Sequence, residues 1–260
     1  MKKIDRKARG GHWLADSDGA IAILEAVREA VPASVPCTVK LRRSYDDTPE
    51  MAASFERILD AAFRIGYAWA TVHGRTVEQK YVGPSRWDIL RDIVRRHPDK
   101  VIFGSGDVWE AADIFRMVEY TGVSAAAVAR GCIGNPWIFR QARRMMAGER
   151  PASPSLDEQR AVLEEHFTLA LAVNGAVHAP DESSGRGPEP APTPVHRRRE
   201  LFTARSMRKF GIRFAQFHPR ADDVRRRFIG VGSLAEWRGV LEEFYGSGVS
   251  ECRPRETTST

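Results

Sequence analysis

Short apolar runs alternate with amphipathic stretches through the first half of this 260-residue chain. The runs are PCTVKL (36–41), YAWATV (67–72), KVIFG (100–104) and SAAAVA (124–129). Between the first two, a helix is predicted to begin at Thr48-Pro49 and to end at Gly66, because these residue types favour helix starts and stops. Strands that alternate with helices at this spacing predict right-handed βαβ units, a parallel sheet and an α/β fold.

The pattern changes after about residue 150, where the apolar positions recur only at helical spacing. The predicted helices span 156–173, 199–217, 220–230 and 233–245. Residues 174–196 are rich in Pro, Gly, Ser and acidic residues and show no apolar period, which predicts a flexible linker. We therefore expect an α/β part at 1–150, a helical part at 151–250 interrupted by the linker at 174–196, and a polar tail at 251–260.

Charge is concentrated in one segment. Residues 195–230 hold ten Arg and one Lys against three acidic residues, a net of +8, whereas the whole chain carries +6. Such a confined basic region favours a polyanion as partner, most commonly nucleic acid; the alternative is a solvated face of Arg-rich helices.

Composition narrows the class of protein further. The three cysteines (Cys37, Cys132, Cys252) lack the spacing of a zinc site, so we expect no metal and a reducing compartment. No apolar run reaches the roughly 20 residues that a membrane span needs, and no signal peptide follows the basic start. The expected location is the cytoplasm.

Polar or glycine-rich segments follow every predicted strand. They are Lys40 with Arg42 and Arg43, His73 with Arg75, GSGD (104–107) and ARGCIGNP (129–136). Ligands of parallel α/β folds bind at the carboxyl ends of the strands, and two successive glycine loops before helix starts favour a phosphate. Taken singly, each has a structural alternative: a lysine at the strand rim, a core histidine, a tight turn.

Five motifs together resemble the tRNA-dihydrouridine synthases in order and spacing. They are TVKLR (38–42), TVHGRTVEQKYVGPSRWDIL (71–90), FGSGDV (103–108), TGVSAAAVARGCIGNPWIFRQ (121–141) and MRKF (207–210). The resemblance covers nearly all of residues 1–175 and resumes at about 199. It implies an FMN-bound TIM barrel with a helical tRNA-binding domain, in which NADPH reduces the flavin and the flavin reduces a uracil extruded from tRNA.

The resemblance also implies roles for individual residues. Lys40 would contact the flavin ring, and His73 with Arg75 would face flavin or uracil. The expected FMN-phosphate residues are Ser105, Gly106, Asp107, Ala129, Arg130 and Gly131. Arg208 and Lys209 would meet the tRNA backbone.

Some features depart from the family pattern. The catalytic cysteine of the family lies in an N-x-G-C-P motif before a KK pair that aligns with Lys2-Lys3, which puts it upstream of Met1. Ser105 stands where asparagine is usual, and MRKF where MRKH is favoured. The four predicted strands would be strands five to eight of the barrel, the C-terminal half of a TIM (β/α)8 fold.

From these departures we expect open sheet edges that self-associate or await a missing N-terminal half, and no synthase activity from this chain alone. Two alternatives stay open. One is a non-catalytic tRNA-binding remnant, and the other is an FMN barrel enzyme that acts on a small molecule.

Overall fold

The structure is a computed structural model that describes residues 9–175 and 194–246. These residues form two compact units, each described by itself. The first comprises the chain to Cys132 together with Ile138–Gly148, and the second comprises Ile133–Trp137 and the chain from Glu149 onward.

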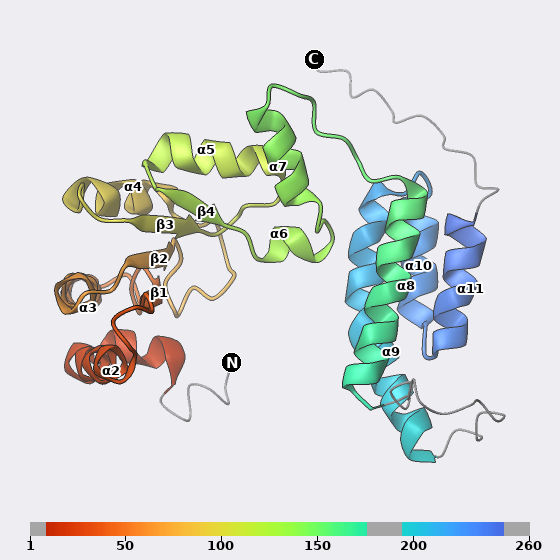
Figure 1. Cartoon of the computed structure of the whole chain (residues 1–260), viewed down its shortest axis with the longest axis horizontal. Coiled ribbons are helices and arrows are strands. Elements are labelled where there is room, and N and C mark those ends of the chain that lie inside the picture. The colour runs from red at the N-terminus through yellow and green to blue at the C-terminus, as the bar shows by residue number, and fades with distance from the viewer. Residues whose placement is uncertain (1–8, 176–193, 247–260) are drawn as a thin grey trace. The chain divides into compact units, whose positions relative to one another are not determined.

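The first unit is built on four parallel strands in the order β1-β2-β3-β4 (Figure 1). The strands are β1 (Thr38–Arg42), β2 (Trp69–His73), β3 (Ile102–Ser105) and β4 (Ala125–Ala127). Pairing aligns Arg42 with His73 and His73 with Ser105, so their carboxyl ends lie level. The predicted α/β fold with a parallel sheet is confirmed.

Local chemistry explains where the crossover helices begin and end. In α3 (Pro49–Ile65) the Thr48 Oγ1 accepts a hydrogen bond from Met51 N at 3.4 Å, with proline at the first turn. Gly66 ends the helix with φ of 101°, a left-handed conformation that favours glycine. Both predicted ends of this helix are therefore confirmed. The other crossover helices are α4 (Trp87–Arg96) and α5 (Ala111–Thr121).

One face of the sheet packs on these helices. Ala70, Val72 and Ile102 are buried in the same apolar cluster as Leu90 of α4 and Leu59 of α3. In Figure 1 the helices α2 to α5 form an arc around the outer side of the strands. The hydrophobic core of this unit thus lies between sheet and helices.

The other face of the sheet carries side chains that remain partly exposed. Trp69, Thr71 and His73 alternate with the buried residues of β2. Trp69 stacks on Phe103 of β3 with ring centroids 5.4 Å apart. Among the described residues of β2, the buried core cluster includes Ala70 and Val72 of the opposite face but not these three side chains.

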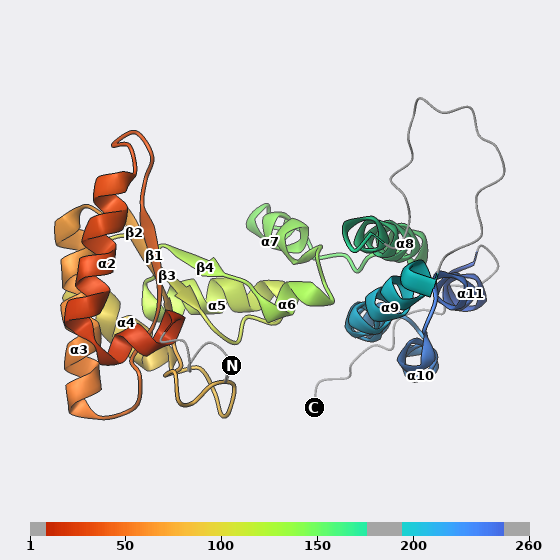
Figure 2. The ribbon, with the colours of Figure 1, turned by 90° about the horizontal axis from the view of Figure 1, so that it is seen from below.

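Additional helices flank the sheet and were not predicted from the apolar pattern. They are η1 (Gly10–Ala15), α2 (Ser17–Ala30), α6 (Arg130–Ile133) and α7 (Ile138–Met146). Figure 2 shows α2 beside α3. Asp16 caps α2 by accepting a hydrogen bond from Gly19 N at 3.0 Å.

The second unit is entirely helical among its described residues. Its helices are α8 (Leu156–Val173), α9 (Pro194–Phe214), η2 (Ala215–Phe217), α10 (Ala221–Gly230) and α11 (Leu234–Tyr245). Phe167, Phe228 and Trp237 pack together at its centre, with ring centroids 4.7 Å apart in both contacts of Trp237. Ser155 and Glu158 form a reciprocal capping box that starts α8 at the predicted residue.

Helix α9 corrects one predicted boundary. It begins at Pro194 rather than at 199, so residues 194–196 of the expected linker are helical, since proline is well suited to a first helical turn. The rest of that linker from 176 onward, and the tail at 251–260, lie outside the described residues. Among the residues that are described, no helix is long and apolar enough to cross a membrane.

Candidate functional site

A cavity of about 140 Å³ lies at the carboxyl ends of the four strands. Seven of the eight residues that the sequence predicted for the cofactor line it: Lys40, His73, Ser105, Gly106, Asp107, Ala129 and Arg130. The eighth, Gly131, is buried behind the wall, where an added Cβ would lie 2.3 Å from Val108 O. The parallel strands thus bring together lining residues that are up to 90 positions apart, from Lys40 to Arg130.

His73 is held as a neutral hydrogen-bond donor. Its Nδ1 accepts a hydrogen bond from Arg75 N at 3.1 Å, which leaves the ring proton on Nε2. Burial, followed by the nearby Arg42, Lys40 and Arg75, lowers the pKa of His73 to about 4. At neutral pH the imidazole therefore offers an N–H group without a charge.

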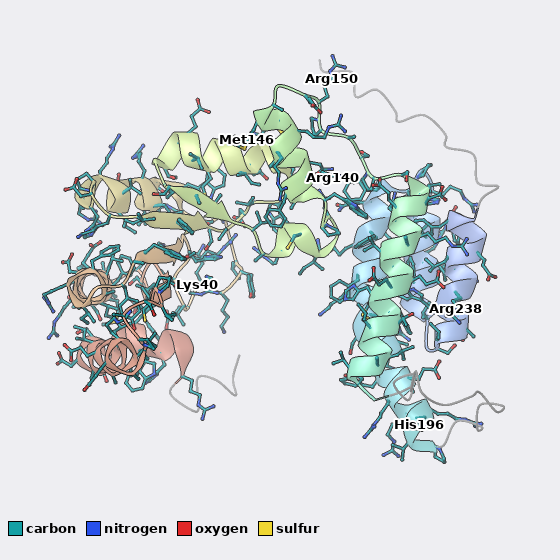
Figure 3. The ribbon with its side chains drawn as sticks, viewed as in Figure 1. Lys40, Arg140, Met146, Arg150, His196 and Arg238 are labelled. Carbon is teal, nitrogen blue, oxygen red and sulfur yellow. The ribbon has the colours of Figure 1, made fainter. Side chains whose placement is uncertain are left out.

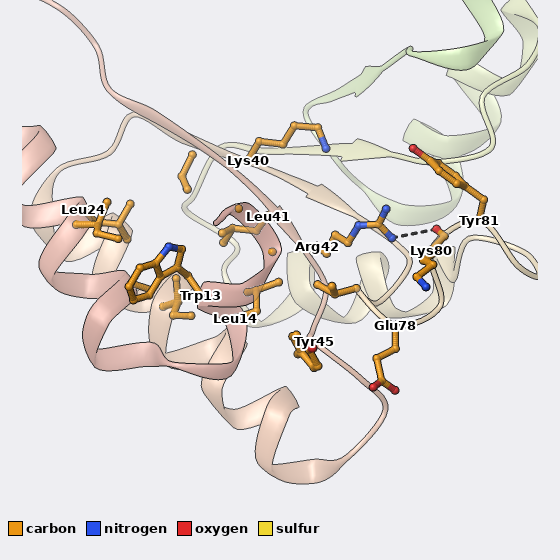
Figure 4. Close-up of a pocket in the computed structure, with 17 residues that line it drawn as sticks. Trp13, Leu14, Leu24, Lys40, Leu41, Arg42, Tyr45, Glu78, Lys80 and Tyr81 are labelled. Atoms are coloured by element: carbon orange, nitrogen blue, oxygen red, sulfur yellow. Dashed lines mark hydrogen bonds between the residues drawn. The ribbon is translucent and has the colours of Figure 1, made fainter. Parts of the chain in front are cut away.

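Lys40 brings a positive charge to the same wall. In the part of the chain that the structure describes, its ammonium group has no hydrogen bond or ion pair. Burial of the side chain, together with Arg42, lowers its pKa from the ordinary lysine value. Figure 3 labels Lys40 on β1, and Figure 4 shows it on the opposite side of the strand from Leu41. An unpaired ammonium at a strand end is suited to an anionic or electron-rich ligand.

Asp107 is the centre of an ion-pair network at the cavity wall. Its carboxylate accepts hydrogen bonds from Ser85 N at 2.7 Å and from Arg75 Nη2 at 2.8 and 2.6 Å. Arg130 Nη2 donates to the same carboxylate at 3.3 Å. Burial alone would raise the pKa of Asp107, but the hydrogen bonds from Ser85 and Arg75 hold it below its usual range. Asp107 is therefore ionised at neutral pH.

Arg75 is buried beside Asp107. It is only 3% exposed, it donates to Asp107 and to Gly83 O, and it does not line the cavity. The ion pair gives the buried Arg75 guanidinium a carboxylate partner, and the expected role of Arg75 toward flavin or uracil stays a prediction. Its role in this geometry is to orient Asp107.

Backbone geometry shapes the GSGD loop. Gly106 has φ of 117° and Asp107 has φ of 55°, so two successive residues adopt left-handed conformations. A Cβ at Gly106 would lie 2.3 Å from Ser85 Oγ. Trp87 Nε1 donates to Gly106 O at 2.9 Å, and Ser105 Oγ donates to Val72 O at 3.4 Å. The loop is thus fixed in a turn that only glycine fits at position 106.

The helix starts differ from the arrangement expected for a phosphate. The N-terminal amides before α5 are already used, because Asp113 accepts from Trp109 N at 2.9 Å and from Glu110 N at 3.1 Å. Helix α6 is only four residues long. Donors for an anion in this cavity are therefore side chains and loop amides rather than helix termini.

Two aromatic residues near the cavity were missed by the sequence analysis. Trp109 lines the cavity, and its ring centroid lies 4.6 Å from the guanidinium carbon of Arg130. Tyr81 lies 4.6 Å from the same carbon on another loop. The only available signal was an aromatic residue two positions after Asp107, which by itself predicts nothing.

A larger hollow of about 870 Å³ runs along the free edge of β1 (Figure 4). Apolar side chains dominate its lining, among them Trp13, Leu14, Leu24 and Leu41. Lys40 lines both this hollow and the smaller cavity. We assign the chemistry to the smaller cavity because the converging polar groups are there.

In the helical unit, the two residues predicted to contact RNA, Arg208 and Lys209, differ in exposure and in their contacts. Arg208 is half-buried and its Nε donates to Val231 O at 2.7 Å. Lys209 is exposed, with its ammonium 4.9 Å from the ring centroid of Phe210. The described residues contain no cluster of His, Cys, Asp or Glu that could hold a metal ion.

The fold is that of an α/β protein with a cavity at the carboxyl ends of its parallel strands, lined by Lys40, His73 and Arg130. The family model described as Dihydrouridine synthase (Dus) matches residues 1–176, and the chain belongs to that family.

Curated relatives carry matching names. The probable tRNA-dihydrouridine synthase of Rickettsia conorii is 32% identical over 175 residues, covering 67% of this chain and 51% of the relative. The tRNA-dihydrouridine synthase B of Pseudomonas putida is 32% identical over 177 residues, 68% of this chain and 51% of the relative. The probable tRNA-dihydrouridine synthase of Mycobacterium tuberculosis is 30% identical over 151 residues, 58% and 38% respectively. The chain thus spans about half, or less, of the length of these relatives.

Proposed function

We propose that this chain supplies the flavin-binding and tRNA-binding parts of a tRNA-dihydrouridine synthase, which reduces uridine in tRNA to 5,6-dihydrouridine with FMN and NADPH. The observation that carries the proposal is the cavity at the strand ends, where Lys40, His73 and Arg130 converge around a carboxylate already neutralised by Arg75. A site with this excess of positive charge suits a phosphate-bearing ligand.

The cavity and its residues fit the phosphate of FMN but do not enclose the whole cofactor. The enclosed cavity of about 140 Å³ accepts a phosphate but is smaller than the pockets of about 300–1,000 Å³ that hold whole cofactors. We assign Arg130 and the loop amides around Gly106 to the phosphate, and Lys40 with His73 to the ring. When bound, FMN would supply hydride transfer from the nicotinamide to the base.

In the proposed site, the side chains of this chain would bind and orient the flavin and the base. The Lys40 ammonium stabilises negative charge that develops on a ligand ring, since a fixed charge at a partly desolvated site acts strongly. The Nε2–H of neutral His73 donates a hydrogen bond to a carbonyl or ring nitrogen without adding charge. Asp107, held by Arg75, fixes one edge of Arg130.

For tRNA, we assign the backbone contact to the helical unit, with the exposed Lys209 as one of its cations. Several neighbouring arginines pair with acidic residues, such as Arg225 with Asp222 at 2.8 Å and Arg227 with Glu243 at 2.9 Å. The net charge of this segment still favours a polyanion, whose binding weakens with salt as counterions are released.

We also propose that the four strands are strands five to eight of a (β/α)8 barrel. Support comes from the partly exposed inner side chains Trp69 and Phe103 and from the apolar hollow along the free edge of β1. Open edges of this kind pair with further strands. Another polypeptide, a second copy or a longer form of this chain would supply them.

Flavin binding is tested with the purified full chain and FMN, by quenching of flavin fluorescence. Gly106→Ala should abolish measurable binding, because the added Cβ meets Ser85 and φ of 117° strains alanine. The matched control is Gly239→Ala, whose Cβ meets nothing within 4 Å and which should bind as the wild type does. Circular dichroism verifies that both variants fold.

Three results would revise this proposal. Tight, salt-dependent tRNA binding without flavin binding would leave only an RNA-binding role. Flavin binding without tRNA binding would favour an enzyme that acts on a small molecule. A monodisperse monomer that converts uridine in tRNA with FMN and NADPH would contradict the half-barrel assignment.

A further inference from the structure

Four side chains from four different strand-end segments form an alternating stack beside the cavity. Arg42 at the end of β1 lies 5.9 Å from the ring centroid of Tyr81, which follows β2. Tyr81 lies 4.6 Å from Arg130, which follows β4, and Arg130 lies 4.6 Å from Trp109, which follows β3. Guanidinium and aromatic groups therefore alternate in the order Arg42, Tyr81, Arg130, Trp109.

Both guanidinium groups of this stack are held by further contacts, one to backbone carbonyls and the other to an ion pair. Arg42 Nη1 donates to Thr76 O at 2.7 Å. It also donates to Lys80 O at 3.0 Å, which fixes the loop that carries Tyr81 (Figure 4). Arg130 also donates to Asp107 at 3.3 Å. The order of the stack thus follows from contacts that need no ligand.

Burial in a hydrophobic core does not explain the positions of the Tyr81 and Trp109 rings. Tyr81 is 65% exposed and Trp109 is 42% exposed, so neither contributes a full core contact. What they share is the guanidinium of Arg130 between them. An arginine stacks on aromatic faces while its edges remain free to donate hydrogen bonds, which lysine cannot do.

We infer that Trp109 and Tyr81 are positioning residues that hold the Arg130 guanidinium at the cavity and so make the site select a phosphate-bearing ligand over the same ligand without phosphate. The inference rests on the proposed flavin-nucleotide site. An unclamped arginine side chain loses rotamer freedom when it binds, whereas a stacked one has already lost it. Pre-organisation therefore strengthens phosphate binding and leaves contacts to a neutral ring unaffected.

The test compares FMN with riboflavin, which lacks the phosphate, on the full chain. Trp109→Ala should weaken FMN binding about five- to tenfold and change the riboflavin Kd less than about twofold, because only the phosphate contact is lost. Trp109→Phe keeps a ring against Arg130 and should restore most of the FMN preference. Tyr81→Ala should act in the same direction as Trp109→Ala.

The chain offers a matched control in Tyr120, a 49% exposed aromatic whose ring lies 5.2 Å from Arg91 away from the cavity. Tyr120→Ala removes a comparable guanidinium contact and should change neither Kd. If Trp109→Ala weakens FMN and riboflavin equally, or weakens neither, the positioning role is wrong.

A second readout separates this inference from the flavin proposal. In NMR spectra the side-chain protons of Arg130 should show ring-current shifts that Trp109→Ala removes. If the wild type binds neither flavin, the FMN proposal fails; titration with inorganic phosphate should then still move the Arg130 Nε–H signal, and less so in Trp109→Ala. Absence of that response in the wild type would overturn the selection of phosphate by Arg130.

Discussion

The cavity of the α/β unit and the surface of the helical unit use arginine in different ways. In the α/β unit, Arg75 is 3% exposed and paired with Asp107, and Arg130 is stacked between two rings. In the helical unit, Arg225 and Arg226 are exposed and pair with acidic residues three positions before them. Figure 3 labels Arg238 of α11, whose Nε lies 3.5 Å from Glu164. A buried ion-pair network fixes the positions of its side chains, whereas an exposed pair contributes little to stability.

The largest expected effect breaks the buried network. Asp107→Ala should destabilise the α/β unit by about 3 kcal/mol, because it leaves the buried charge of Arg75 without its partner. Asp222→Ala in the helical unit is the matched control and should cost only about 0.3 kcal/mol, since its pair is exposed. Hydrogen exchange resolved by segment measures both, and equal effects would contradict the contrast between the units.

Lowering the pH should reduce the stability of the α/β unit through protonation of His73. The folded pKa of about 4 lies below the ordinary 6.5, so between these values the unfolded chain binds the additional proton. Stability therefore falls as the pH is lowered from 6.5 to 4, by about 2 kcal/mol after allowing for solvent screening.

In His73→Gln this part of the pH dependence should disappear. Denaturant unfolding at several pH values measures it, and the difference between the two proteins cancels the contributions of the other histidines. Identical pH profiles would show that folding does not lower the pKa of His73.

Within the helical unit, two neighbouring basic residues should have different roles, one in stability and the other in tRNA binding. Arg208→Ala should cost about 1 kcal/mol of stability, because its side chain donates to Val231 O. Lys209→Ala should leave stability nearly unchanged and lower the slope of tRNA affinity against salt by about one. Binding isotherms at several salt concentrations test this, and an unchanged slope would remove Lys209 from the interface.

Much of the frame was predictable from the sequence. Strand positions followed from apolar runs, and the ends of α3 followed from Thr48 and Gly66, because these signals are local. The convergence of Lys40, His73 and the two glycine loops followed from the rule that parallel strands end on one side.

What the sequence did not predict depends on side-chain directions across loops. The ion pair of Arg75 with Asp107 joins two loops 32 positions apart, and no local pattern around Arg75 indicates this partner. The stack of Trp109 and Tyr81 on Arg130 joins three loops that have no common pattern. The early start of α9 depended on a single proline at the end of a polar segment.

Lys40 forms part of the wall of both hollows in the α/β unit. Any group that fills the apolar hollow displaces water from one side of that lysine and so strengthens its electric field on the other side. Occupancy of the hollow and affinity in the cavity are then thermodynamically linked, and each changes the other by the same factor. One ammonium group thereby connects the completion of the sheet edge to the strength of anion binding.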